Sequence, residues 1–157
     1  MDGLQDAELT NFSIVYASSS GAKHEQFVEY DPGTQYYDWV GYSWWGGDRD
    51  GEAALAYARK VKKPVFIAEA TPRGRFFDKE NSKDIWNSWF VKFFNHIEQN
   101  RDVVRAMSYI NADWDSQDMW KGEGWGQTRL ETAPFLKSKW LENCLLYTSD
   151  AADDTPC

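Results

Sequence analysis

Cysteine is scarce in this chain of 157 residues: there are two, Cys144 and Cys157, and both lie near the C-terminus. They provide neither the ligand spacing of a metal site nor a persuasive disulfide framework. Long apolar runs are also missing, so the sequence contains no candidate membrane-spanning helix. No signal peptide is recognisable before the first expected strand.

Basic residues are outnumbered by acidic ones. Lys and Arg total 17 against 25 Asp and Glu, which gives a net charge of −8. This balance argues against nucleic acid as a partner, because phosphate recognition needs a basic face. Aromatic residues, by contrast, make up 17% of the chain and include 9 Trp. Since tryptophan is seldom fully buried, we expect several of them to line a cleft or an interface.

A short apolar run that ends in a carboxylate lies at the centre of the sequence. Pro64 is followed by Val65, Phe66 and Ile67, and Glu69 comes two residues later. This pattern predicts a strand buried on both faces, as in a parallel sheet. Glu69 would then lie at the C-terminal end of the strand, where β/α barrels carry their catalytic residues. The simpler alternative is an ordinary salt-bridged or helix-capping carboxylate.

Strand and helix patterns alternate along the chain. The expected strands cover residues 11–20, 37–45, 64–70 and 103–114, and the expected helices cover residues 23–30, 51–61, 83–99 and 133–143. This alternation requires a parallel sheet, which doubly wound sheets and barrels both contain. No nucleotide-binding glycine pattern follows any strand, and the strands end in Ser, Trp, Glu or Asp. The sequence therefore favours an α/β fold, a partial (β/α)8 TIM barrel with a polar small-molecule or carbohydrate-like site.

The helices carry further expectations. The helix over 83–99 has an apolar stripe, with Ser82 as its expected N-cap, and Asp48 or Asp50 is expected to cap the helix over 51–61. His24 and His96 are expected at exposed helical positions and carry no functional signal.

Three stretches, by their order and spacing, resemble family 26 of the glycoside hydrolases, the β-mannanase-like group. They are Tyr30-Asp31-Pro32-Gly33 with Tyr37-Asp38-Trp39-Val40-Gly41, the stretch Pro64 to Pro72, and the stretch Ser108 to Trp114. The resemblance covers residues 11–143. It implies a (β/α)8 barrel that cleaves β-linked polysaccharides with retention of configuration and without a metal or organic cofactor. This chain would hold strands five to eight with their helices.

The resemblance also assigns catalytic roles. Glu69 matches the family's nucleophile at the end of strand seven. A retaining glycosidase needs a second carboxyl group, and the family's acid/base Glu at the end of strand four would precede Met1, so we expect this fragment alone to be inactive. The family often has a Tyr that contacts the nucleophile. Trp45 stands at the matching position, with an indole N–H in place of a phenol.

Candidate substrate-binding residues lie at the strand ends. Flat indole faces suit the C–H faces of sugar rings, and polar side chains can bind sugar hydroxyls. For each residue the alternative is core packing, filling of the barrel interior or capping of a loop. The candidates are Trp44, Trp45, Trp114, Tyr109, Asn111 and Asp113.

The sequence as a whole predicts a fragment of a secreted, retaining β-glycan hydrolase acting on mannan or a related β-glucan. One alternative is a non-catalytic carbohydrate-binding module that uses a tryptophan-lined surface and does not need Glu69. Another is an unrelated α/β domain whose aromatic residues serve packing. Residues 1–143 are expected to form half of the barrel domain. Residues 144–157 resemble a translated sequencing adapter and are expected to be a non-native, disordered tail, with a genuine acidic C-terminus as the alternative.

Overall fold

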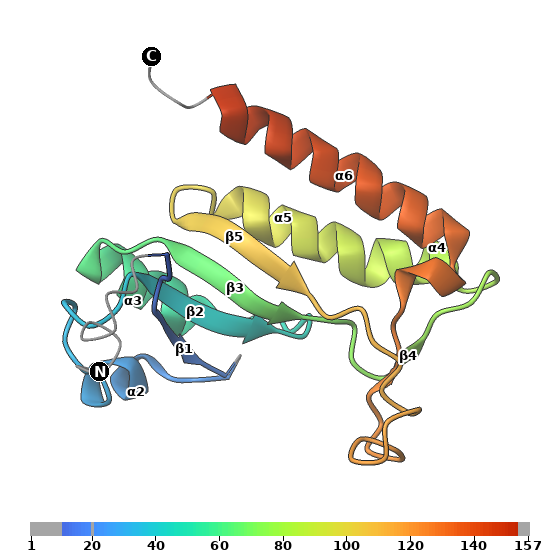
Figure 1. The fold of residues 1–157 in the computed structure, drawn as a ribbon, viewed down its shortest axis with the longest axis horizontal. Helices are drawn as coiled ribbons and strands as arrows, with labels where there is room; N and C mark the ends of the chain where they lie inside the picture. Colours follow the sequence, from blue (N-terminus) through green and yellow to red (C-terminus); the bar gives the residue numbers. More distant parts are fainter. Residues whose placement is uncertain (1–10, 20, 154–157) are drawn as a thin grey trace. The chain divides into compact units, whose positions relative to one another are not determined.

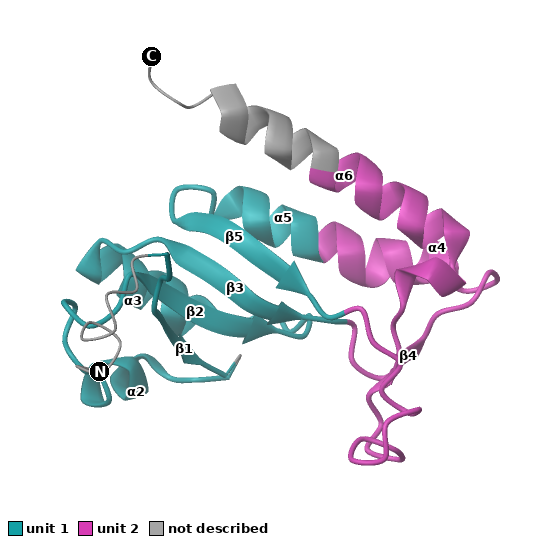
Figure 2. Ribbon diagram, viewed as in Figure 1, with its two compact units in different colours: residues 1–71, 93–110 teal, residues 72–92, 111–157 magenta. Residues whose placement is uncertain are grey.

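The computed structural model describes residues 11–19 and 21–153, with the backbone alone described for residues 145–153. The chain forms two compact units, shown in Figure 2: residues 1–71 and 93–110 form the first, and residues 72–92 and 111–157 the second. Residues 1–10 of the expected barrel half and residues 154–157 of the expected tail lie outside the described residues.

A parallel sheet of four strands is the framework of the first unit. Its strands are β1 (Val15–Ser18), β2 (Trp39–Trp44), β3 (Val65–Ala70) and β5 (Val104–Tyr109). They lie side by side in the order β1-β2-β3-β5, and each pair is parallel (Figure 1). The predicted α/β class and the parallel sheet are therefore confirmed. Doubly wound sheets reverse their strand order at a switch point, and the strands described here show no such reversal.

Helices connect these strands. The strand β1 leads into α2 (His24–Glu29), and β2 leads into α3 (Glu52–Val61). Between β3 and β5 the chain forms three consecutive helical segments, α4 (Ser82–Ile85), the π-helical turn η1 (Trp86–Phe90) and α5 (Val91–Gln99), in place of the single predicted helix. Of these three segments, only the part of α5 from Phe93 to Gln99 belongs to the first unit.

One face of the sheet, which we call the helix face, carries the helices of the first unit, which are α2, α3 and the part of α5 from Phe93 to Gln99. In β2 it presents Val40, Tyr42 and Trp44, all buried. The Tyr42 hydroxyl hydrogen-bonds His96 of α5, and the Trp44 ring packs 5.1 Å from that of Phe93 in the same helix.

The helices α2 and α3 pack on this same face. Tyr16 of β1 pairs with Val40, so both side chains point to one side of the sheet. The Tyr16 hydroxyl donates to the carbonyl of Phe27 in α2, and its ring lies 6.1 Å from that of Tyr57 in α3. All three connecting helices of the first unit thus cover one side of the sheet.

The opposite side, which we call the open face, is only partly covered. Alternation and strand register assign to it Val15, Ala17, Trp39, Gly41, Ser43, Phe66, Glu69, Ala106 and Ser108. Apart from buried Gly41, these residues are half-buried or exposed. The backbone of Gly41 lies so close to Val15 that a Cβ at position 41 would come within 2.6 Å of the Val15 side chain.

The second unit contains a short parallel pair of strands, β4 (Arg75–Phe76) and β6 (Gly126–Gln127), in segments that the sequence predicted as loops. The 3-10 turn η2 (Leu130–Thr132) leads into α6 (Pro134–Asp153). Phe90 centres an aromatic core, with ring centroids 5.4 Å from Trp86 and 6.0 Å from both Phe77 and Trp140. Helix α6 continues beyond the predicted end at Asn143, so its backbone is helical within the segment expected to be disordered. The non-native origin of that segment stays a prediction.

The predicted helix caps are wrong. Gly51, with φ of 82°, occupies the N-cap position of α3, and Asn81 occupies that of α4; neither gives a side-chain capping bond. The Ser82 hydroxyl donates instead to the Lys79 carbonyl. Among the described residues no helix is long and apolar enough to span a membrane.

Candidate active site

Glu69 lies near the C-terminal end of β3, and its carboxylate is exposed. The Ser43 hydroxyl of the neighbouring strand β2 donates a hydrogen bond of 2.8 Å to Glu69 Oε2. Ser43 and Glu69 are also register partners in the β2–β3 pairing. The carboxylate is therefore held at the strand end where a β/α barrel carries its chemistry.

A β-bulge decides which face of the sheet Glu69 points to. Tyr42 pairs with Ile67, but Ser43 pairs with Glu69, so Ala68 is an extra residue in β3. Without this extra residue, strict alternation would put Glu69 on the helix face together with Ile67. The bulge turns Glu69 to the open face, where it meets Ser43. Bulges commonly redirect a side chain next to a functional site.

The loop after β2 is fixed by the carboxylate of Asp50, which was predicted from the sequence as a helix cap. Asp50 Oδ2 accepts hydrogen bonds from the backbone N–H groups of Trp45, Gly46 and Gly47, at 2.8, 3.0 and 2.9 Å. Trp45 directly follows the end of β2 and is half-buried. Asp50 therefore fixes the backbone of Trp45, two residues after Ser43 in the sequence.

Two predicted substrate-binding residues lie on the helix face. Trp44 is 3% exposed and packs against Phe93 and His96 of α5. Tyr109 is the register partner of Ala70, which in turn pairs with Trp44, so its side chain is on the same side as Trp44. The structure therefore places both residues on the opposite side of the sheet from Glu69.

Trp114 belongs to the second unit and is the centre of an aromatic cluster. Its ring lies 5.5 Å from that of Trp120 and 5.0 Å from that of Trp125. The Arg73 guanidinium lies 4.2 Å over the Trp125 ring, a cation–π distance. Trp114 is only 9% exposed, whereas Trp120 and Trp125 are half-buried. The more accessible members of this cluster are therefore Trp120 and Trp125.

Asn111 and Asp113 hold loop structure within the second unit. The Asn111 side-chain oxygen accepts from the Leu130 N–H at 2.8 Å, and its amide donates to Glu131 at 2.9 Å. Asn111 thereby holds the pKa of the Glu131 carboxyl below its ordinary value. Asp113 pairs with Arg129 at 3.3 Å. Both side chains therefore have protein partners in the positions observed.

His96 was predicted at an exposed position, but it is half-buried and contacts β2. Its Nε2 lies 2.5 Å from the Tyr42 hydroxyl, and burial lowers the pKa of the imidazole, with Asp50 acting weakly in the opposite direction. The sequence did indicate that His96 is partly covered, because it lies three residues after Phe93 and adjoins the apolar stripe of the helix. Ser43 gave no comparable signal, since a serine in a strand is common on either face.

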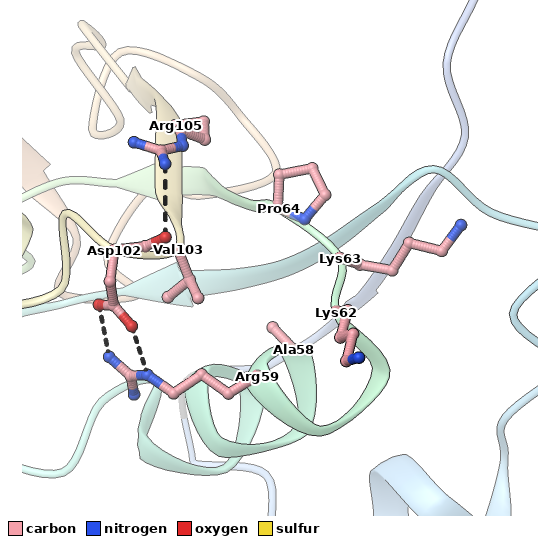
Figure 3. A pocket seen from close by; sticks show the side chains of 8 residues that line it. All are labelled: Ala58, Arg59, Lys62, Lys63, Pro64, Asp102, Val103 and Arg105. Atoms are coloured by element: carbon pink, nitrogen blue, oxygen red, sulfur yellow. Dashed lines mark hydrogen bonds and ion pairs between the residues drawn. The ribbon is translucent and has the colours of Figure 1, made fainter.

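A cavity of about 380 Å³ lies at the other end of the sheet, where β3 and β5 begin. Figure 3 shows Arg59 and Asp102 joined across it by two hydrogen bonds, both 2.8 Å. The Arg105 guanidinium donates to the Asp102 carbonyl at 3.5 Å, whereas the side chain of Lys63 points away from that pair. The hydrogen bonds that Asp102 accepts from Arg59 hold the pKa of the Asp102 carboxyl below its ordinary value. Both arginines therefore already donate to Asp102, so this cavity provides no evident anion site. Within the described part of the chain, no group of three or more His, Cys, Asp or Glu is arranged to hold a metal ion.

Comparison with known proteins gives two curated relatives, and no family model matches the chain. A β-1,3-xylanase of Alcaligenes sp. is 36% identical over 162 residues, which cover 85% of this chain and 34% of that protein. The β-1,3-xylanase TXYA of Vibrio sp. is 35% identical over 158 residues, which cover 84% of this chain and 34% of that protein.

These relatives correct two predictions. Their name contradicts the resemblance to the β-mannanase-like family 26, and it contradicts mannan or a β-glucan as the substrate. The reason is that one scaffold with carboxylates and aromatic residues at its strand ends serves many substrates. The broader prediction of a glycan hydrolase agrees with both names. The chain is similar to β-1,3-xylanases and spans about a third of the length of the curated relatives it matches.

Proposed function

We propose that this chain is part of a glycoside hydrolase that cleaves β-1,3-xylan and that Glu69 is its catalytic nucleophile. The observation that carries this proposal is the exposed Glu69 carboxylate, turned by the Ala68 bulge to the open face at the C-terminal end of β3. The names of the two relatives support the substrate.

The proposed scaffold is a partial (β/α)8 barrel. Three features of the first unit support it: strands that follow chain order, connecting helices on one face only, and an open face of mixed apolar and polar residues. In a closed barrel the face away from the helices forms the interior, and the mouth carries the site. The edge strands β1 and β5 would pair with the strands that complete the barrel.

The proposed chemistry needs two carboxyl groups about 5–5.5 Å apart. A Glu69 oxygen attacks the anomeric carbon as the bond to the leaving oxygen breaks, and a second carboxylic acid gives that oxygen its proton. Water, deprotonated by the same second group, then releases the sugar from Glu69. We expect the second group to come from a part of the protein outside this chain. Secretion of the protein, inferred from a polymeric substrate, also stays a prediction.

Trp45 is the residue that we propose stacks on a xylosyl ring. It is half-buried, it follows the strand that carries Ser43, and its backbone is fixed by Asp50. Trp44, Trp114 and Tyr109 were predicted to contact substrate as well. The burial of the two tryptophans and the register of Tyr109 favour packing for these three.

The test is hydrolysis of β-1,3-xylan by the full-length protein that contains this chain, with Glu69→Gln compared with wild type. We expect a loss of about 10³-fold or more in kcat with the binding of xylo-oligosaccharides retained. Glu29→Gln, an exposed carboxylate at the end of α2, is the matched control and should leave kcat unchanged. A Glu69→Gln protein of normal activity would refute the assignment. A wild-type protein that binds xylan without hydrolysing it would favour a carbohydrate-binding module.

A further inference from the structure

Ser43 is the residue whose position the proposed function does not yet explain. It lies in β2, on the open face, and is half-buried. Its hydroxyl donates to Glu69 Oε2 at 2.8 Å. A serine hydroxyl can also accept, but an ionised carboxylate accepts only, so in this pair Ser43 is the donor whenever Glu69 is ionised.

The hydrogen bond uses one of the two carboxylate oxygens. With Oε2 engaged by Ser43, the other oxygen, Oε1, is left to attack a substrate. A glutamate side chain has three rotatable bonds, and an exposed one samples many rotamers in water. A single hydrogen bond from a neighbouring strand restricts that sampling. Attack requires the reacting atoms to be held about 3–3.5 Å apart in the correct direction. Restricting the Glu69 rotamers to that direction therefore raises the rate of the attack step.

The backbone makes this contact specific to the two residues. The Ala68 bulge brings Glu69 into register with Ser43, and the strand pairing resumes at once with Trp44 opposite Ala70. Ser43 is thus fixed by regular sheet pairing on either side of the bulge. A donor on a rigid strand positions a catalytic group better than a donor on a loop.

Folding stability gives a weaker reason for the contact. The hydrogen bond is exposed, and in that setting water competes for both partners, so its net contribution to folding is small. The orientation of the Glu69 carboxylate, in contrast, depends on the hydrogen bond from Ser43 unless another donor replaces that hydroxyl.

We propose that Ser43 is a positioning residue for Glu69, holding Oε2 so that Oε1 faces the anomeric carbon. This inference rests on the proposed function, because it assumes that Glu69 is the nucleophile. Ser43 itself gains and loses no covalent bond in the reaction.

The experiment compares Ser43→Thr and Ser43→Val in the full-length protein, with xylo-oligosaccharides as substrate. Threonine and valine have almost the same shape, so the two variants differ chiefly in the hydroxyl. We expect Ser43→Val to lose about ten- to hundredfold in kcat with KM within about threefold of wild type, and Ser43→Thr to recover most of the loss. The thermal unfolding midpoints of the two variants should agree, which separates positioning from a structural role.

Glu69→Gln, measured in parallel, separates the two hypotheses. If Glu69→Gln is inactive while Ser43→Val and Ser43→Thr have equal kcat, the positioning role is wrong and the proposed function stands. If Glu69→Gln retains activity, the proposed function fails, and the inference fails with it. If Ser43→Val and Ser43→Thr both have a low kcat because threonine is too large for the site, Ser43→Ala provides the test. A wild-type kcat in Ser43→Ala overturns the positioning role. A loss in kcat with KM unchanged supports it.

Discussion

The Tyr42 hydroxyl lies 2.5 Å from Nε2 of His96, so a buried strand residue and a helix residue are joined through their polar atoms. Their rings meet edge to face, with centroids 6.0 Å apart. Burial raises the pKa of the Tyr42 phenol and lowers the pKa of the His96 imidazole. We infer that both groups are neutral near pH 7, with Tyr42 as the donor and His96 as the acceptor.

This pair predicts a loss of stability in mild acid. The folded-state pKa of His96 lies below its unfolded value of about 6.5, so below that pH the unfolded chain binds a proton that the folded chain does not. The stabilisation is fully present above about pH 6.5 and declines as the pH falls toward the folded-state pKa. Unfolding midpoints measured from pH 8 to pH 5 should show this decline.

The chain offers an internal control for that measurement, since His24 is its other histidine. His96→Gln should remove the part of the pH dependence between pH 6.5 and the folded-state pKa, and His24→Gln should retain it. An identical pH dependence in wild type and His96→Gln would show that the half-buried His96 imidazole is not its source.

Gly51 is predicted to tolerate no side chain. Its φ of 82° is left-handed, and a Cβ at this position would overlap the ring of Tyr42. Gly51→Ala should therefore cost about 2 kcal/mol or more in the free energy of unfolding, from strain and from displacement of a buried ring. The control is Gly21→Ala, where a Cβ meets nothing within 4 Å. Equal stability of the two variants, measured by urea denaturation, would argue against this account of the start of α3.

Asp50 is predicted to be the anchor of the loop after β2. Asp50→Ala removes the acceptor of three backbone N–H groups and should cost about 2–3 kcal/mol, because hydrogen bonds to a charged group are the stronger kind. Asp50→Asn retains a neutral acceptor oxygen and should lose less. Hydrogen exchange at the amides of residues 45–47 provides the local readout: protection should fall in Asp50→Ala. Unaltered protection there would mean that other contacts hold the loop.

Adjacent tryptophans are predicted to behave differently. Trp44→Ala empties a site that is 3% exposed and should destabilise the protein by about 3–5 kcal/mol. Trp45→Ala should change stability less and should raise KM for xylo-oligosaccharides, because a stacking platform contributes mainly to binding. Paired thermal unfolding and steady-state kinetics would check this. A Trp44→Ala protein of normal stability but weakened substrate affinity would reverse the assignment.

The strand and helix order could be predicted because the signals are local. The run from Val65 to Ile67 and the alternation of patterns need no knowledge of neighbouring strands, and the resulting parallel sheet was observed. The helix caps could not be predicted in the same way. Asp50 has the right residue type and place for a cap, but the three amides of residues 45–47 compete for its carboxylate, and that competition depends on the path of the loop.

The candidate site was predictable only in part. Glu69 at the end of a strand follows from the sequence, whereas the face it points to depends on the Ala68 bulge, which exists only in the pairing of two strands. For Trp44 and Trp45 the sequence shows neither that the strand ends between them nor which of the two is buried. The substrate could not be read from the strand-end motifs at all, because the same residue types serve different polysaccharides.

Covalent labelling tests the central claim most directly. A 2-deoxy-2-fluoro xylosyl or xylo-oligosaccharide reagent with a good leaving group traps the glycosyl-enzyme intermediate of a retaining hydrolase. Peptide mass spectrometry of the full-length protein should place the label on Glu69, and Glu69→Gln should remain unlabelled under the same conditions. A label on another carboxylate, or equal labelling of wild type and Glu69→Gln, would contradict the account.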